Sequence, residues 1–262
     1  MAALLNACGI YAVSSQLPEF SGVFRGRELT RKERRLSSNL QPVNDLLGGG
    51  IPRGRISEII GRQSSGKTSL AASFIAAATQ RGETIAVVDL EGAFDPLTMA
   101  AAGVDLNRVL WAAARSAANG YRSSSAHPMG AAWKAAELIL AAGGFGLLVL
   151  DLGGGGRRSI PHSAALRVAR LAERSGTSVL VLASYRMCGT FAALSLALSR
   201  GSPLFDGCAD GPATFDGFGI EALVTRNKLG GSGGRGHWRT AIDPASGDQY
   251  AAPNHQQAWL IG

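Results

Sequence analysis

The sequence predicts an α/β fold in which helices cover both faces of a mostly parallel central sheet, with an antiparallel hairpin late in the chain. Between residues 56 and 184, short apolar segments alternate with helical segments, a rhythm typical of parallel β–α units. The pattern then changes to two strand-like segments that flank the glycine-rich Gly230–Gly236. A glycine loop also separates the first of these apolar segments from the first long helix.

The expected strands are buried, apolar and short, and the expected helices follow them in turn. Strands are predicted at Ile56–Ile60, Glu83–Leu90, Arg108–Trp111, Phe145–Asp151 and Ser178–Ser184. Helices are predicted from Ser69, from Pro96, over 129–142 and over 161–174, and a short helix ends at the glycines of Leu46–Gly50. The late hairpin pairs Ile220–Thr225 with His237–Ile242.

Three parts are expected along the chain: an N-terminal arm over residues 1–39, a core over 40–245 and a C-terminal strand or tail over 246–262. The arm contains a basic segment, Arg25–Arg35, that can form a short helix. Two interpretations of this segment stay open, a solvated face or a contact with DNA or protein.

Bulk composition favours a folded chain with an anionic partner. The 262 residues are 46% hydrophobic and 17% charged, which allows one α/β domain with a substantial core. The net charge of +7 favours a partner such as nucleic acid, although excess charge also serves solubility.

We expect a cytoplasmic protein without a membrane partner. No apolar run is long enough to cross a bilayer, and the first apolar residues lack a preceding basic stretch. Cys8, Cys188 and Cys208 have no metal-ligand spacing and are interpreted as reduced thiols. His162 and His237 are interpreted as surface or hairpin residues, because no ligand cluster accompanies them.

The strongest motif is Gly61–Thr68, which fits the phosphate-binding pattern G-x-x-x-x-G-K-[ST]. An ordinary glycine–serine turn is the alternative, but the flanking strand and helix favour a phosphate site. Lys67 would reach the β- and γ-phosphates, and Thr68 would hold Mg²⁺. The predicted nucleotide-binding residues in this loop are Gly61, Arg62, Gln63, Ser64, Ser65, Gly66, Lys67, Thr68 and Ser69.

Acidic residues follow two of the predicted strands, where ligands of open α/β sheets bind. Asp151 ends an apolar strand and is placed to bind Mg²⁺, directly or through water; a strand-end turn is the alternative. Glu91 is a candidate for orienting or deprotonating the attacking water, unless the base lies elsewhere. If the preceding strand continues, Asp89 and Glu91 share a face.

The chain resembles the bacterial RecA recombinases over roughly residues 40–245. The similar stretches are Leu46–Arg55, Gly61–Leu70, Val88–Pro96 and Gly103–Leu106. The resemblance implies a RecA-like P-loop ATPase core that uses ATP and Mg²⁺. It also implies that Glu91 is the catalytic glutamate, acting with Lys67, and that Asp95 lies near the adenine.

Basic residues in the later half extend the resemblance. Arg226 and Lys228 resemble the pair with which a RecA subunit contacts the ATP of its neighbour, and Arg186 resembles the entry to the second DNA-binding loop. Arg157 and Arg158 stand in what resembles a shortened first loop. These five residues are predicted to contact DNA or a neighbouring subunit; scattered surface charge is the alternative. Trp238 either stacks on a ligand or packs in the hairpin.

Departures from the RecA pattern narrow the expected function. Ser184 stands where RecA has a glutamine that senses the γ-phosphate, and Thr98 stands where RecA has a tyrosine that stacks on adenine. No large domain is expected after the hairpin. A core reduced in this way resembles the ImuA group, RecA-related accessory proteins of bacterial mutagenic translesion synthesis.

The resemblance therefore implies an ATP-binding accessory protein of the DNA-damage response that contacts RecA, translesion polymerase components and, as an open possibility, single-stranded DNA or further copies of itself. Its ATPase would be weak and Mg²⁺-dependent. The alternative is a DNA-dependent ATPase and recombinase that forms filaments on single-stranded DNA. A cell-division inhibitor is disfavoured, since steric inhibition needs no phosphate site.

Overall fold

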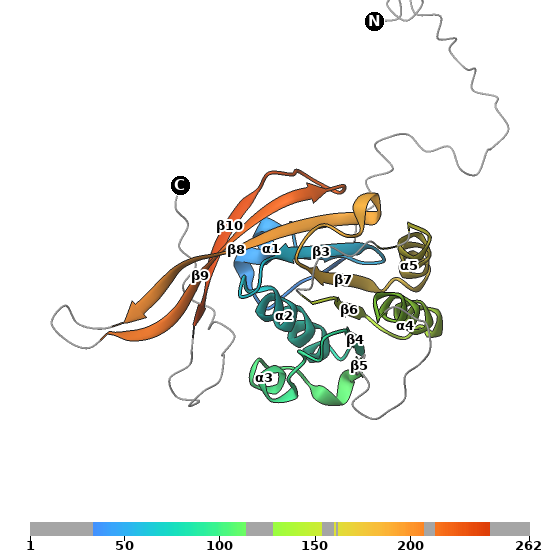
Figure 1. The fold of residues 1–262 in the computed structure, drawn as a ribbon, viewed down its shortest axis with the longest axis horizontal. Helices are drawn as coiled ribbons and strands as arrows, with labels where there is room; N and C mark the ends of the chain where they lie inside the picture. The colour runs from blue at the N-terminus through green and yellow to red at the C-terminus, as the bar shows by residue number, and fades with distance from the viewer. Residues whose placement is uncertain (1–33, 114–127, 154–159, 161, 207–212, 242–262) are drawn as a thin grey trace, which may run out of the picture. The chain divides into compact units, whose positions relative to one another are not determined.

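The computed structural model describes residues 34–113, 128–153, 160, 162–206 and 213–241. All of them belong to one compact unit, Glu33–Gly262. The described residues form an eight-stranded sheet in the order β10-β9-β8-β3-β7-β6-β4-β5, with helices on both faces (Figure 1). The strands from β8 to β5 pair in parallel, and β9 and β10 are antiparallel additions. The predicted α/β class is thus confirmed.

The strands of the main sheet are β3 (Ile56–Gly61), β4 (Ile85–Asp89), β5 (Val109–Ala113), β6 (Leu147–Asp151), β7 (Ser178–Ala183), β8 (Ala192–Asp206), β9 (Thr214–Asn227) and β10 (Arg235–Ala241). A small second sheet pairs β1 (Arg35–Leu36) with β2 (Ile51–Pro52). The helices are α1 (Gln41–Leu46), α2 (Lys67–Gln80), α3 (Pro96–Ala101), α4 (Pro128–Ala142) and α5 (His162–Ser175), with short 3₁₀ turns η2 (Leu106–Arg108) and η3 (Gly189–Phe191).

Continuous apolar runs form the central strands because both faces of the sheet are covered. In β4, Ile85 and Val87 pack in the cluster that contains α2, whereas Ala86 and Val88 pack in the cluster that contains α4 and α5. Alternate side chains of a strand point to opposite faces, so each β4 side chain meets one helical layer or the other. This arrangement fixes which strand ends meet at each edge of the sheet.

The late antiparallel region is larger than the predicted hairpin. Strand β9 begins at Thr214, and it pairs with β8 as well as with β10. The sequence analysis assigned no strand to β8, which runs parallel to β3 and joins the hairpin to the sheet. Residues 199–203 include Gly201 and Pro203, where the pairing with β9 shifts register. This irregularity hid the strand in the sequence pattern.

The described end of the predicted N-terminal arm, residues 34–39, is integrated into the structure. Leu36 is fully buried in the core, and Arg35 lies in β1, where its guanidinium donates to the carbonyl oxygens of Leu47 and Gly50. The prediction that a basic helix can extend to Arg35 is therefore wrong for that residue, which lies in a strand. The rest of the predicted helix, before Arg34, lies outside the described residues. None of the helices in the described ranges is long and apolar enough to cross a membrane.

The connection from β7 to β8 is a short crossover over β3, formed by Ser184–Phe191. Parallel strands usually need about a dozen connecting residues or more. Here the fully buried Glu58 of β3 fixes the segment: its carboxyl accepts hydrogen bonds from the amides of Met187 (2.8 Å) and Cys188 (2.6 Å) and from the Ser195 hydroxyl (3.1 Å). The crossover segment is thereby held on the face that α5 covers.

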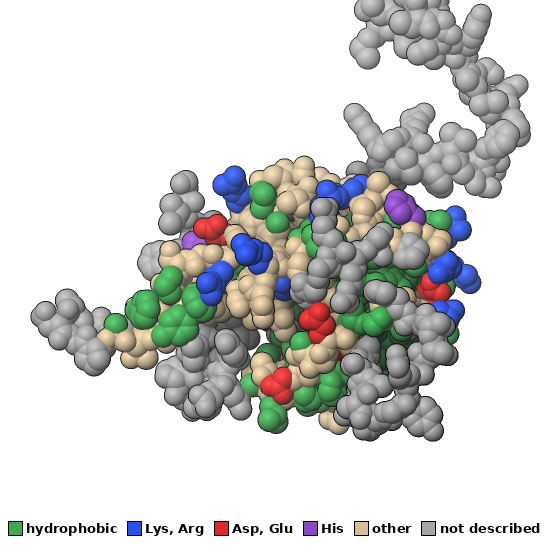
Figure 2. Space-filling model, viewed as in Figure 1, with side chains coloured by type: hydrophobic (Ala, Val, Ile, Leu, Met, Phe, Trp, Pro, Cys, Tyr) green, Lys and Arg blue, Asp and Glu red, His purple; other side chains and the backbone are tan. Residues whose placement is uncertain are grey.

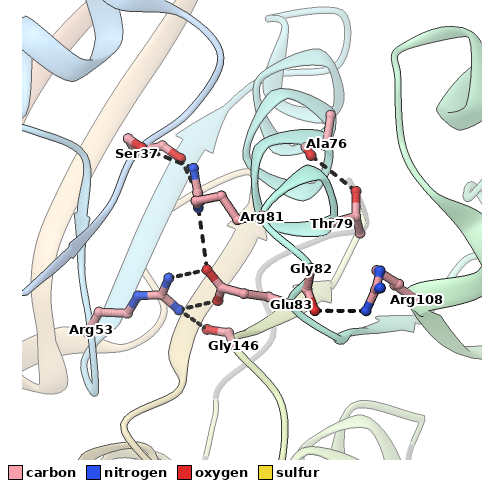
Figure 3. Close-up of polar contacts among 9 residues, drawn as sticks. All are labelled: Ser37, Arg53, Ala76, Thr79, Arg81, Gly82, Glu83, Arg108 and Gly146. Atoms are coloured by element: carbon pink, nitrogen blue, oxygen red, sulfur yellow. Dashed lines mark hydrogen bonds and ion pairs between the residues drawn. The ribbon is translucent and has the colours of Figure 1, made fainter.

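The parallel strands give the sheet two unlike edges. We call the edge where β3, β4, β6 and β7 end the carboxyl edge, and the opposite one the amino edge. At the amino edge, Arg53 makes two hydrogen bonds of 2.6 Å to the carboxylate of Glu83 and donates to the Gly146 carbonyl at 2.9 Å (Figure 3). Arg81 and Arg108 extend this network to Ser37 and Gly82. These hydrogen bonds therefore hold the starts of several strands together at the amino edge.

Candidate functional site

The predicted phosphate loop lies at the carboxyl edge, between β3 and α2. Ser64 and Gly66 both have positive φ, at 59° and 87°, so the chain turns sharply before α2 begins. A Cβ at Gly61 would lie 2.3 Å from Ser65 Oγ and 2.7 Å from the Leu198 carbonyl oxygen, which leaves room only for glycine. These contacts set the tight curvature of a phosphate cradle.

The start of α2 suits an anionic ligand. Helix α2 has Gly66 as its N-cap and no side-chain cap, so its first N–H groups are directed to the loop interior. The buried Ser65 Oγ also has no hydrogen-bond partner within the described residues. Lys67 Nζ donates to the carbonyl oxygens of Gly61 (2.5 Å) and Arg62 (2.8 Å). Because burial removes water from this amine, the pKa of Lys67 is lowered, although Asp151 opposes the change.

Three carboxyl groups gather beside Lys67. Burial raises the pKa of Asp151, and the nearby Asp89 and Glu91 carboxylates raise it further, while the Gly153 amide and Lys67 lower it. Glu91 approaches this loop closely, since a Cβ at Gly153 would lie 2.0 Å from Glu91 Cδ. The structure therefore brings together Lys67, Glu91 and Asp151, as the sequence predicts. A divalent cation would reduce the repulsion between the Glu91 and Asp151 carboxylates.

The donor set fits Mg²⁺ bound together with phosphate. The described residues contain no cluster of three or more His, Cys, Asp or Glu side chains able to hold a metal alone. Thr68 is exposed on the first turn of α2, and Asp151 ends β6. A hydroxyl and one carboxylate match a Mg²⁺ ion whose remaining ligands are water and phosphate oxygens. Such an ion would add positive charge where the phosphates lie.

Two of the other acids have structural roles at this edge. Strand β4 ends at Asp89, so Asp89 and Glu91 do not continue one strand face; instead the buried Asp89 carboxylate accepts from the amides of Gly92, Ala93 and Phe94 at 2.8–3.0 Å. Asp95 is the N-cap of α3 and accepts from the amides of Leu97 and Thr98 and from the Thr98 hydroxyl. These bonds lower the pKa of Asp95. Its predicted role near adenine stays a prediction.

Two of the predicted DNA or neighbour contacts, Arg226 and Lys228, lie away from this cradle. Arg226 Nη1 donates to the Gly189 carbonyl at 3.1 Å, and Lys228 Nζ donates to that of Thr190. Arg226 is paired with Ser195 near the start of β8, and Lys228 follows the last residue of β9, on the side of the amino edge. Burial, with Arg226 and Arg55 nearby, lowers the pKa of Lys228. Arg186 is exposed on the crossover segment. Arg157 and Arg158 lie outside the described residues.

Sequence reasoning missed two parts of the surroundings. Glu58 anchors the crossover segment, and its signal was a charged residue inside an apolar strand. A cavity of about 370 Å³ borders Ser64–Ser69, with a second wall formed by β8, β9 and β10. The region of β8 and early β9 was unassigned in the sequence analysis, so this wall was not foreseen. Trp238 is 7% exposed, packs in the core and also lines the cavity.

Comparison with known proteins shows what this chain is similar to. Residues 25–120 match the family described as the RecA N-terminal domain. A RadB recombinase structure superposes with a TM-score of 0.56 over 79% of this chain and 96% of that chain, at 19% identity. The chain is therefore similar to the RecA N-terminal domain over these residues, and it has the fold of the RadB structure. At this identity the RadB likeness establishes the fold alone.

Sequence similarity to the RecA proteins of Synechocystis and Arthrospira covers less than a third of this chain. The chain is 53% identical over 75 residues to Protein RecA of Synechocystis sp., covering 29% of this chain and 21% of that protein. It is 45% identical over 85 residues to Protein RecA of Arthrospira platensis, covering 32% and 23%. The chain thus spans less than a quarter of the length of these curated relatives.

Proposed function

We propose that this chain binds ATP with Mg²⁺ through the cradle Gly61–Ser69. The observation that carries the proposal is the position of Lys67 at the uncapped start of α2, beside the acidic end of β6. Lys67 would exchange its loop carbonyl partners for β- and γ-phosphate oxygens, and Thr68 and Asp151 would hold Mg²⁺. The bound ion would supply charge neutralisation at the phosphates. Glu91 would orient water for slow hydrolysis.

The finer role proposed is that of an accessory protein in the bacterial DNA-damage response, assisting error-prone translesion synthesis. Two features favour this role over strand exchange. The crossover segment is short and fixed on Glu58, so it lacks the length of a mobile DNA-binding loop. Ser184 also follows the last residue of β7, with a side chain too short to reach a γ-phosphate as glutamine would. Contacts with RecA, with translesion polymerase components and with single-stranded DNA belong to this proposal.

The position of Arg226 and Lys228 supports assembly with a second RecA-like subunit. Arg226 is level with Glu58 of β3 and Lys228 lies farther toward the start of that strand, whereas the cradle follows its end, so the strand register separates Arg226 from Gly61 by roughly 10 Å. The pair is therefore directed away from the chain's own phosphates. We propose that it contacts a nucleotide held by a neighbouring subunit, either another copy or RecA itself.

The deciding experiment measures ATP binding and turnover with and without single-stranded DNA. We expect Mg²⁺-dependent ATP binding that Lys67→Ala removes, turnover that single-stranded DNA stimulates weakly, and retention of RecA on the immobilised chain. Unchanged ATP affinity in Lys67→Ala would contradict the nucleotide site. Strong stimulation by DNA together with filaments seen by electron microscopy would instead support the recombinase alternative.

A further inference from the structure

The cavity beside the phosphate cradle has two unlike walls. One wall is formed by the cradle and α2, with Thr98, Met99 and Ala102 of α3. The other wall comes from three antiparallel strands and carries Arg200, Phe215, Phe218, Ile220, Trp238 and Thr240. The cavity volume of about 370 Å³ falls in the range of small-molecule sites. A ligand with phosphates in the cradle would extend directly into this space.

Strand register places the second wall against the loop. Ile220 meets the cradle, since a Cβ at Gly66 would lie 2.8 Å from Ile220 Cδ1. Ile220 is paired with Arg200 on β8 and with Trp238 on β10, and Phe218 is paired with Thr240. Phe218 therefore follows Ile220 on the same face of β9, one step farther out from the loop. The wall continues the cradle with an aromatic surface.

The aromatic side chains of this wall form a connected group with a cation above it. The rings of Phe215 and Phe218 have centroids 4.8 Å apart, and the Arg200 guanidinium carbon lies 4.8 Å from the Phe218 ring centre. Farther out, Phe205 contacts Phe215 at 5.8 Å and is 62% exposed. Figure 2 shows hydrophobic side chains over the β8–β9 hairpin beside Lys and Arg side chains. Aromatic faces and a guanidinium plane are the surfaces on which bases stack.

We propose that this wall binds the base of a purine nucleoside triphosphate whose phosphates occupy the cradle; this rests on the proposed function. Phe218 and Arg200 supply the stacking surface, and Met99 and Ala102 cover the opposite side. The residues that the RecA resemblance assigns to the base are engaged with each other, because the Thr98 hydroxyl donates to Asp95. Strands β8–β10 thus take over base binding from the start of α3.

The test compares two probes, ATP and inorganic tripolyphosphate, each with Mg²⁺. Wild type should bind ATP more tightly than tripolyphosphate, and ATP or GTP more tightly than UTP. Phe218→Ala should weaken ATP binding about tenfold and leave tripolyphosphate binding unchanged. Phe218→Leu, which keeps the site apolar and protects folding, should weaken ATP in the same direction. Phe205→Ala is the control, because Phe205 does not line the cavity.

Each outcome separates the two proposals. Equal affinity of wild type for ATP and tripolyphosphate, or unchanged ATP affinity in both Phe218 variants, would overturn base binding while leaving the cradle intact. Loss of tripolyphosphate along with ATP in Phe218→Leu would also overturn it, since the effect would then be structural. Failure of wild type to bind either probe would remove the proposed function and this inference with it.

Discussion

In the Arg53–Glu83 cluster at the amino edge of the sheet, charged groups neutralise each other, whereas at the carboxyl edge Asp151 has other carboxylates nearby. Burial alone would raise the pKa of Glu83, but the hydrogen bonds from Arg53 outweigh it and the pKa is lowered. At the carboxyl edge the pKa of Asp151 is raised and that of Lys67 is lowered. Both edges contain cations and carboxylates. Arg53 and Glu83 pair completely at the amino edge, whereas Lys67 and Asp151 pair incompletely at the carboxyl edge. Incomplete pairing is typical of a site that receives a charged ligand.

The largest expected effect is on binding at the carboxyl edge. Lys67→Ala should lower ATP affinity about 100-fold or more, because phosphates desolvated in the cradle lose their cation. Calorimetric titration measures this change. Lys134→Ala on α4 is the control, since Lys134 is largely exposed and lies outside the cavity. An equal loss in both variants would mean that the effect is not local to the cradle.

The next effect is on stability at the amino edge. Arg53→Ala should lower the free energy of unfolding by about 2 kcal/mol, because Glu83 keeps only the longer Arg81 contact at 3.4 Å. Urea denaturation measures this change. In wild type the pair's contribution should fade as the pH drops below 4.5, the ordinary pKa of Glu83, because its folded-state pKa is lowered.

Arg55→Ala is the matched control for Arg53→Ala. Its ion pair with Glu173 is 3.4 Å long and exposed, so the stability change should stay within about 0.5 kcal/mol. ATP affinity should be unaffected in Arg53→Ala. If this variant weakened ATP binding as strongly as Lys67→Ala does, the separation between the two edges would be lost.

The third prediction concerns stability at the carboxyl edge, where removing a charge should raise stability rather than lower it. Asp151→Asn should weaken the Mg²⁺-dependent part of ATP binding about tenfold and raise stability at neutral pH. Because the folded-state pKa of Asp151 is raised, its favourable contribution exists at low pH and is lost as the pH rises through that pKa. Replacing the Asp151 carboxylate with a neutral amide therefore removes its repulsion with Asp89 and Glu91. Denaturation and titration of the same sample test both signs, and a stability loss at pH 7 would contradict the crowding described here.

The smallest effect is expected for Arg226→Ala in the isolated chain. Arg226 lies at the amino edge, so intrinsic ATP affinity should stay within about twofold of wild type. Turnover that depends on a neighbouring subunit should fall. Steady-state hydrolysis measured against increasing protein concentration separates the two contributions, and a loss of ATP affinity at low concentration would show that Arg226 acts within its own chain.

How far sequence predicted this molecule depends on the range of the interactions involved. Gly61–Thr68 and the strand ending at Asp151 are local patterns, so the cradle and most of the parallel sheet were predicted. Strand β8 was missed, although Leu194, Leu196 and Leu198 alternate, because residues 199–203 interrupt the pattern.

Side-chain roles set by distant partners were also missed. Glu58 binds amides about 130 positions away along the chain. The Arg200–Phe218 wall depends on strand register, which the residue pattern of one strand does not specify. Asp89 and Glu91 were expected to share a face if their strand continued, but β4 ends at Asp89. These errors share one cause, since each depends on where another segment lies in space.

The anchored crossover segment limits what substitutions and insertions can do to the connection between β7 and β8. A stretch as long as Ser184–Phe191 reaches at most roughly 30 Å when extended, and its ends are roughly 16 Å apart before the rise over β3 is added. Part of the remaining length is needed to rise over β3 to the Glu58 anchor, and only added residues, not point substitutions, can make the segment a long loop. The exposed Gly189 and Thr190, beyond the Glu58 anchor, are where an insertion would cost the least.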